Sequence, residues 1–180
     1  VHPSRRSYPG AHSEPEELNE KEPHCGSFFE RGKTMKISIM GYSGAGKTTL
    51  ANQLAAQYGC GVLHLDRVNF THGWRERDRA EAQQMLEETL AQADWVIDGN
   101  YANLCIDRRL AQSDRIILLM FPRRVCFFRA VKRYLRYRGR TRPDMGEGCE
   151  EKFDPEFAKW ILWEGRSRQY RERLLDCAQT

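Results

Sequence analysis

Short apolar runs alternate along the chain with segments in which apolar residues recur every three or four positions. The apolar runs are typical of buried strands and lie at residues 36–40, 62–66, 95–98 and 115–121. The segments with the longer period are typical of helices and lie at residues 49–58, 80–91, 104–111, 122–137 and from Asp154 onward. Because strands and helices alternate, we expect right-handed crossovers and a parallel sheet with helices on both faces, a three-layer α/β/α fold.

The first part of the chain lacks this pattern. Residues 1–34 are rich in Pro, Ser, Glu, His and Gly and hold few large apolar side chains, so they cannot bury enough surface to offset the entropy of ordering. We interpret them as a disordered extension, either vector-derived or translated from upstream of Met35; a regulatory tail is the alternative. Residues 35–180 suffice for one domain with one core.

Composition narrows the class of protein. No apolar run approaches the ~18 residues that a membrane span needs. The six cysteines are scattered, with no C-x-x-C pair and no zinc-site spacing, which is typical of a reduced, cytoplasmic protein. The formal net charge is only +4, but no acidic residue lies between Asp114 and Asp144, where arginines are frequent. That stretch should attract phosphate groups.

One motif carries specific chemistry. Residues 41–48 read G-Y-S-G-A-G-K-T, the P-loop pattern, between a predicted strand and a predicted helix. Its glycines let successive backbone N–H groups point into one concave nest, and the helix start adds its positive end. Lys47 can reach the β- and γ-phosphates, and the Thr48 hydroxyl can bind Mg²⁺. We therefore expect a nucleoside triphosphate to be held by Gly41, Ser43, Gly44, Ala45, Gly46, Lys47, Thr48 and Thr49.

Two carboxylates close predicted strands at the edge where sheets of this kind bind ligands. Asp98 follows apolar residues, as a Walker B aspartate does, and could hold Mg²⁺ together with Thr48; a turn cap is the alternative. Asp66 could orient or deprotonate an acceptor hydroxyl, and a cap at the strand end is again the alternative.

The basic stretch allows three interpretations. It could be a solvated helix face, it could bind nucleic acid, or it could supply arginines that stabilise a transferring phosphoryl group. Residues 138–151 contain Gly139, Pro143 and further glycines, which favours a mobile loop. Such a loop could close as a lid over a nucleotide and exclude water, carrying Arg138, Arg140 and Arg142.

Much of residues 35–170 resembles the DNA topology modulation (FlaR-like) proteins, which are adenylate-kinase-like P-loop kinases. The resemblance rests on GYSGAGKTTLANQL at 41–54, LHLD at 63–66, WVIDGNY at 95–101, RIILLMFPR at 115–123 and, most specifically, YLRYRGRTRPDMGEGC at 134–149. It implies ATP and Mg²⁺ as cofactors, the sheet order 2-3-1-4-5, and Asp98 as the magnesium-side aspartate. It also implies phosphate-binding positions for the arginines in and beside the lid, which are Arg129, Arg133, Arg138, Arg140, Arg142 and Arg166.

The sequence departs from the adenylate kinase pattern in three features, which concern the acceptor site, the sheet edge and the lid. The segment DGNY at 98–101 lacks the acceptor-binding arginine of the adenylate kinase D-G-F-P-R motif, which leaves Arg108 and Arg109 as candidates. The usual fifth strand is missing from the pattern, so the strand from Arg115 would form an exposed apolar edge. Cys149 is alone in the lid, so the four-ligand zinc of some adenylate kinase lids is not supported.

The sequence as a whole predicts an ATP- and Mg²⁺-dependent phosphotransferase that acts on a nucleotide or small-metabolite acceptor. Its expected catalytic residues are Lys47, Asp66, Arg138, Arg140 and Arg142. The alternative is a nucleic-acid-associated regulator that uses the basic residues 123–142.

A chain that begins at Met35 should fold as the full chain does, because residues 1–34 contribute no core. We expect the two chains to have the same midpoint of thermal unfolding and the same affinity for nucleotide. A midpoint several degrees lower in the shorter chain would show that residues 1–34 pack on the domain.

Overall fold

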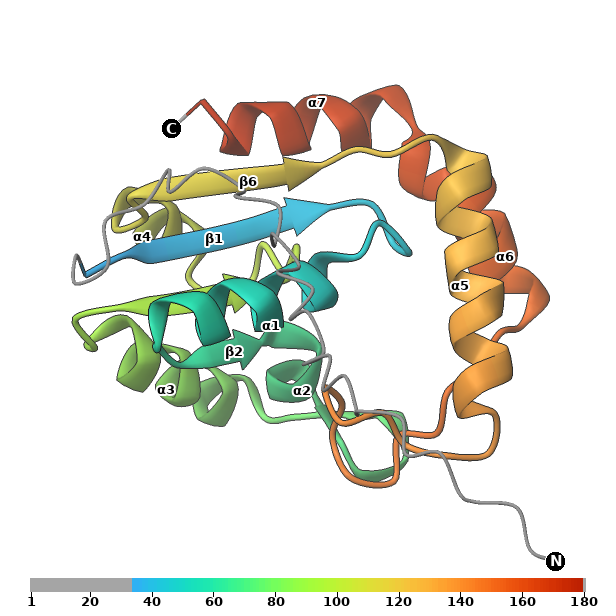
Figure 1. Ribbon diagram of the computed structural model, residues 1–180, viewed down its shortest axis with the longest axis horizontal. Helices are drawn as coiled ribbons and strands as arrows, with labels where there is room; N and C mark the ends of the chain where they lie inside the picture. Colours follow the sequence, from blue (N-terminus) through green and yellow to red (C-terminus); the bar gives the residue numbers. More distant parts are fainter. Residues whose placement is uncertain (1–33, 180) are drawn as a thin grey trace, which may run out of the picture. The chain divides into compact units, whose positions relative to one another are not determined.

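A computed structural model describes residues 34–179, so the interpretation of the segment before Thr34 lies outside the described residues. Its main sheet is four-stranded and parallel, with the order β2-β5-β1-β6 (Figure 1). The strands are β1 (Lys36–Gly41), β2 (Val62–His64), β5 (Trp95–Asp98) and β6 (Arg115–Leu119). Counted along the chain, this is the order 2-3-1-4 of the expected fold, and residues 34–179 contain no fifth strand in this sheet.

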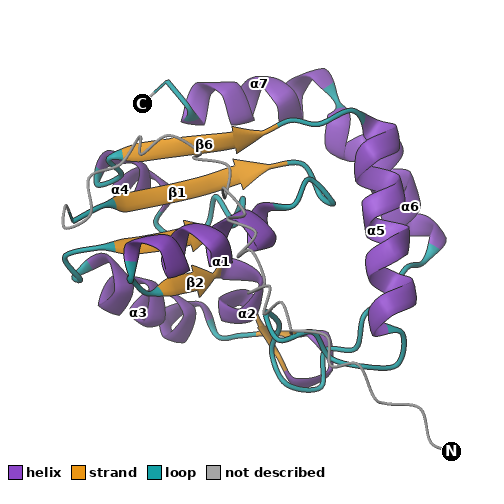
Figure 2. Ribbon diagram, in the orientation of Figure 1, coloured by secondary structure: helices purple, strands orange, loops and turns teal. Residues whose placement is uncertain are grey.

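Helices connect the strands, as the apolar spacing predicted (Figure 2). The longer helices are α1 (Lys47–Tyr58), α3 (Arg79–Leu90), α4 (Ile106–Ala111), α5 (Arg123–Tyr137), α6 (Pro155–Leu162) and α7 (Arg168–Cys177), with a 3₁₀ turn at Glu164–Arg166 between the last two. Local chemistry explains several starts. The side chain of Asp78 accepts hydrogen bonds from the N–H groups of Ala80 and Glu81, and Asp154 caps α6 through the N–H of Phe157.

The second strand is shorter than predicted, and Asp66 does not close it. Strand β2 ends at His64, and the chain turns at once into α2 (Leu65–Asn69), which carries Asp66 in its first turn. The reason is core packing. Leu65 and Val68 lie three residues apart, and both are fully buried, which a helix permits and an alternating strand does not.

A small hairpin follows where the sequence predicted only a polar loop. It consists of β3 (Phe70–Thr71), a 3₁₀ turn at His72–Trp74 and β4 (Arg75–Glu76), with β3 and β4 paired antiparallel. Within residues 34–179, no helix is long and apolar enough to cross a membrane.

Two buried clusters hold these layers together. One joins β5 to α2 and α3, through Trp95, Ile97, Leu65, Leu86 and Leu90 among others. The second joins β1 to the later helices, through Met40, Leu110, Cys126, Ala130, Ile161 and Leu174. Burial of these apolar side chains fixes the sheet between its helices.

Strand β6 is an edge strand, as expected, but a helix packs against its apolar side chains. Helix α7 runs alongside it in Figure 1. Leu174 of α7 is buried in the cluster against which Ile116 and Leu118 of β6 pack. The helix therefore covers apolar surface that a neighbouring strand would otherwise have to cover.

The packing of α7 can be tested with two adjacent leucines. Leu174 is 1% exposed and Leu175 is 36% exposed. We expect Leu174→Ala to lower the free energy of unfolding by about 2–5 kcal/mol, because it leaves a cavity in the core. Leu175→Ala is the matched control and should cost less than about 1 kcal/mol. Equal losses in urea denaturation would contradict the packing of α7 on β6.

Candidate active site

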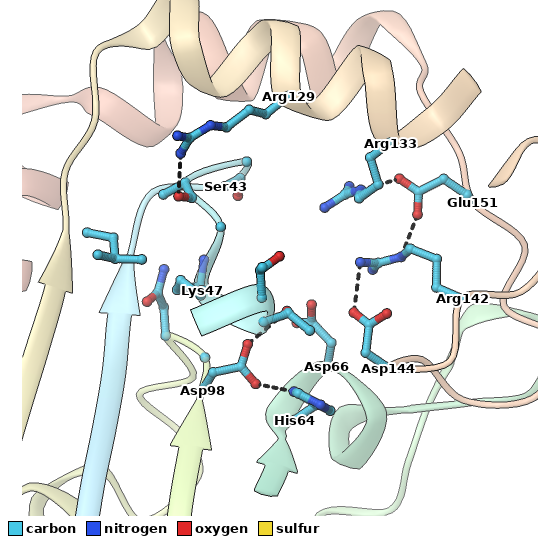
Figure 3. A pocket seen from close by; sticks show the side chains of 18 of the residues that line it. Ser43, Lys47, His64, Asp66, Asp98, Arg129, Arg133, Arg142, Asp144 and Glu151 are labelled. Atoms are coloured by element: carbon cyan, nitrogen blue, oxygen red, sulfur yellow. Dashed lines mark hydrogen bonds and ion pairs between the residues drawn. The ribbon is translucent and has the colours of Figure 1, made fainter. Parts of the chain in front are cut away.

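A cleft of about 1640 Å³ opens at the carboxyl ends of β1, β2 and β5. The P-loop, the start of α2, the inner side of α5 and the loop after α5 form its walls (Figure 3). Every residue of the P-loop from Ser43 to Thr49 lines it, as do Asp66 and Asp98. The sheet thus brings together in one cleft side chains that lie far apart in the sequence.

The P-loop needs its glycines because other backbone segments lie against it. Gly41 has φ 137°, and a Cβ there would lie 2.2 Å from the carbonyl oxygen of Leu119. Gly44 has φ 76°, and its Cβ would lie 2.4 Å from the carbonyl oxygen of Cys126. Only glycine fits both positions without moving β6 or α5.

Lys47 is the first residue of α1, and its side chain turns back onto the P-loop. Its ammonium donates hydrogen bonds to the carbonyl oxygens of Gly41, at 3.0 Å, and Tyr42, at 3.2 Å. Burial lowers the pKa of Lys47 below its ordinary value, the charges of Asp66 and Asp98 oppose that shift, and the nearby charge of Arg133 adds to it. The lysine is therefore placed close to both carboxylates and to an arginine of α5.

Thr48 and Asp98 meet directly. The hydroxyl of Thr48 donates to Oδ2 of Asp98 at 2.9 Å, and Nδ1 of His64 lies 2.5 Å from Oδ1 of the same carboxylate. A hydroxyl and a carboxylate are oxygen ligands suited to Mg²⁺, which usually keeps several waters and phosphate oxygens besides one or two protein ligands. Residues 34–179 hold no cluster of three or more His, Cys, Asp and Glu side chains that could bind a metal.

The pKa of His64 reflects two opposing effects. Burial alone would lower it, but the hydrogen bond to Asp98 and the charges of Asp98, Asp144 and Asp66 raise it above the ordinary value. His64 is therefore a cation at a higher pH than a histidine in water.

Asp66 faces the cleft from the first turn of α2 (Figure 3). The hydroxyl of Tyr101 donates to its Oδ1 at 2.8 Å. Burial and the charge of Asp66 raise the pKa of Tyr101, so the tyrosine remains a hydrogen-bond donor. One carboxylate oxygen is thus fixed by Tyr101 in the wall of the cleft.

The predicted arginines lie in different surroundings. Arg129 and Arg133 of α5 line the cleft; Nη1 of Arg129 donates to the carbonyl oxygen of Ala45 at 2.9 Å. Arg142 also lines it, but it is buried and paired with Asp144 and Glu151. Arg138 and Arg140 are exposed and lie outside the lining of the cleft.

The remaining candidate arginines do not line the cleft. Arg166 donates to the carbonyl oxygens of Ile161 and Phe121 and stacks over the ring of Tyr42, 4.2 Å from its centroid. Arg108 is exposed and pairs with Glu87. Arg109 is fully buried, and burial lowers its pKa to about 10. Neither Arg108 nor Arg109 lines the cleft.

Sequence reasoning missed four residues of this site, which are His64, Asn100, Asp144 and Glu151. Asn100 accepts from the N–H of Gly41 and donates to its carbonyl oxygen, at 3.0 and 2.7 Å, so it fixes the start of the P-loop. The signal in the sequence for His64 is its polar side chain within the apolar run of residues 62–65, and the structure pairs it in register with Asp98. Glu151 had no such signal, since its partners lie 9 and 18 residues away in an irregular loop and on α5.

Solved structures of similar fold include two shikimate kinases. The enzyme from Acinetobacter baumannii, in complex with shikimate, has a TM-score of 0.54 and 22% identity, over 81% of this chain and 80% of that one. The enzyme from Bacteroides thetaiotaomicron has a TM-score of 0.50 and 22% identity, over 81% of this chain and 84% of that one. At this identity the likeness shows the fold alone, and it confirms the predicted three-layer α/β/α fold with a parallel sheet.

Comparison with the sequences of known proteins finds similarity over only half of this chain. Fatty acid ABC transporter ATP-binding/permease proteins of Mycobacterium bovis and Mycobacterium tuberculosis are 35% identical over 91 residues. That alignment covers 49% of this chain but only 13% of each transporter protein. No family model matches the chain. These findings do not single out the DNA topology modulation family.

The His64–Asp98 pair makes stability depend on pH. Because the folded pKa of His64 lies above its ordinary value of 6.5, the folded protein keeps a proton that the unfolded chain has lost. The stabilisation is fully present below the unfolded pKa and disappears as the pH rises through the folded pKa. We expect the advantage of the wild type over His64→Gln in free energy of unfolding, measured in urea with a chelator, to shrink as the pH rises. His72→Gln, at an exposed histidine, is the control. A difference that is constant with pH would contradict the pairing.

Proposed function

We propose that this chain is an ATP- and Mg²⁺-dependent phosphotransferase that acts on a nucleotide or another small-molecule acceptor. The observation that carries the proposal is the placement of Lys47, Thr48 and Asp98 at the floor of the same cleft that Asp66 and the arginines of α5 face. This placement joins a phosphate-binding loop, a magnesium-type ligand pair and a candidate base within one cavity. The P-loop kinase fold of the shikimate kinases agrees with it.

The residues have separable roles in this proposal. The P-loop N–H groups and Lys47 bind the phosphates of ATP, and Thr48 and Asp98 hold Mg²⁺, which neutralises charge on the phosphate oxygens. Asp66 orients the acceptor hydroxyl and accepts its proton as that oxygen bonds to the γ-phosphorus. The bond from the γ-phosphorus to the bridging oxygen breaks at the same time, and ADP leaves with the bond's electron pair. Arginines at the cleft wall stabilise the charge of the transferring group.

The acceptor is proposed only as a class. The enzyme from A. baumannii was solved with shikimate, which favours a small hydroxyl compound over a macromolecule. No comparison supports the nucleic-acid-associated alternative, although its basic residues are mostly exposed, namely Arg123, Arg124, Arg129, Lys132, Arg136, Arg138 and Arg140. A panel of nucleotides and hydroxyl metabolites, shikimate included, would identify the acceptor by its stimulation of ADP release from Mg-ATP.

Two P-loop variants test donor binding without the acceptor. Lys47→Ala should weaken Mg-ATP binding by about one to two powers of ten, because a charge-assisted phosphate contact is lost. Thr48→Ala should weaken ATP binding only when Mg²⁺ is present. Lys159→Ala is the matched control, since Lys159 is exposed and pairs with Glu164 outside the cleft. Equal ATP affinity of wild type and Lys47→Ala in calorimetry would overturn the proposal.

A further inference from the structure

Four charged side chains form a continuous chain along one wall of the cleft (Figure 3). Nε of Arg133 donates to Oε1 of Glu151 at 2.7 Å, and Nε of Arg142 lies 2.7 Å from Oε2 of Glu151. Nη1 of Arg142 donates to Oδ2 of Asp144 at 2.8 Å. Glu151 is the link, because one of its oxygens pairs with α5 and the other with the loop of residues 138–151.

Burial makes this link rigid. The side chain of Glu151 is 2% exposed and that of Arg142 is 8% exposed. The backbone of Glu151 is also fixed, since its N–H donates to the carbonyl oxygen of Arg140 at 3.1 Å. A buried carboxylate persists only when it is well paired, and loss of one partner leaves an uncompensated charge. Glu151 therefore holds its two arginines in defined positions.

The two arginines differ in which of their guanidinium nitrogens take part in ion pairs. Arg142 uses both Nε and Nη1 in ion pairs within the loop. Among the hydrogen bonds of residues 34–179 Arg133 donates only through Nε, and its Cζ lies 5.9 Å from the centroid of the Phe157 ring, so its two terminal nitrogens have no hydrogen-bond partner there. Figure 3 shows the Arg133 side chain pointing from α5 into the space opposite the P-loop. The charge of Arg133 also contributes to lowering the pKa of Lys47.

We propose that Glu151 is a positioning residue for phosphoryl transfer, which holds Nε of Arg133 so that its terminal nitrogens face the γ-phosphate bound beside Lys47. This inference rests on the proposed function. In this inference Arg133 is the side chain of this wall that contacts phosphate. Arg142 instead holds Glu151 in place through their ion pair. A guanidinium held at Nε presents its two terminal N–H groups in a fixed plane, which suits a phosphate.

The test compares two neighbouring glutamates. Glu151→Gln keeps the shape of the side chain but removes the charge that orients Arg133, and Glu150→Gln removes the same charge from an exposed position. We expect Glu151→Gln to bind Mg-ATP about tenfold more weakly and Mg-ADP as the wild type does, because ADP lacks the γ-phosphate. Glu150→Gln should bind both as the wild type does. Equal weakening of ATP and ADP by Glu151→Gln would overturn the inference.

A double-variant cycle separates positioning from general structure. If Glu151 acts through Arg133, adding Glu151→Gln to Arg133→Ala should cause no further loss of Mg-ATP affinity. Additive losses would overturn the inference. If Glu151→Gln fails to fold in thermal unfolding, Glu151→Asp takes its place, since it keeps the charge but shortens the reach. It should weaken Mg-ATP binding and spare Mg-ADP, and wild-type affinity for both would overturn the inference.

Failure of the proposed function would look different. A wild type that does not bind Mg-ATP, or a Lys47→Ala variant that binds it as tightly as the wild type, overturns both proposals. Wild-type binding that depends on Lys47 but is unaffected by Glu151→Gln overturns only the role of Glu151.

Discussion

The half-buried ammonium of Lys47 is the group on which the rest of the cleft depends. A partly desolvated charge needs polar partners, and the carbonyl oxygens of Gly41 and Tyr42 accept its hydrogen bonds. Asp66 and Asp98 favour the charged form, whereas burial and Arg133 oppose it. The ammonium therefore lies in the cleft that carboxylates, an arginine of α5 and the P-loop line, which agrees with the proposed binding of phosphate groups.

Backbone packing sets the position of that charge. Gly41 lies against Leu119 of β6 and Gly44 against Cys126 of α5, so the P-loop is held between a strand and a helix that come much later in the chain. Asn100 ties the start of the loop to the end of β5 and to the hydroxyl of Tyr170 on α7. The edge strand and the last helix thus support the proposed phosphate site, and Leu119, Tyr170 and Arg173 also line the cleft directly.

The loop of residues 138–151 connects the two sides of the cleft. On one side Glu151 pairs with Arg133 of α5. On the other side, Nε1 of Trp74 donates to the carbonyl oxygen of Glu150 at 2.9 Å, and Sγ of Cys149 donates to that of Thr71 at 3.1 Å. The hairpin that follows Asp66 is therefore packed on the loop that holds the arginines, and a displacement of either would disturb the other.

The sequence by itself determined the local elements of this protein. The P-loop, the helix that follows it and the cap at Asp78 depend on neighbouring residues, and the alternation of strands and helices indicated the fold class. Tertiary structure decided the rest. Because Leu65 and Val68 pack into the core, Asp66 lies in a helix and not at the predicted strand end. Arg142 is buried next to Glu151, whereas Arg138 and Arg140 are exposed. The position of Asp66 and the burial of Arg142 both depend on which residues, distant in the sequence, pack together in the low-dielectric interior. The spacing of neighbouring residues in the sequence does not predict this packing.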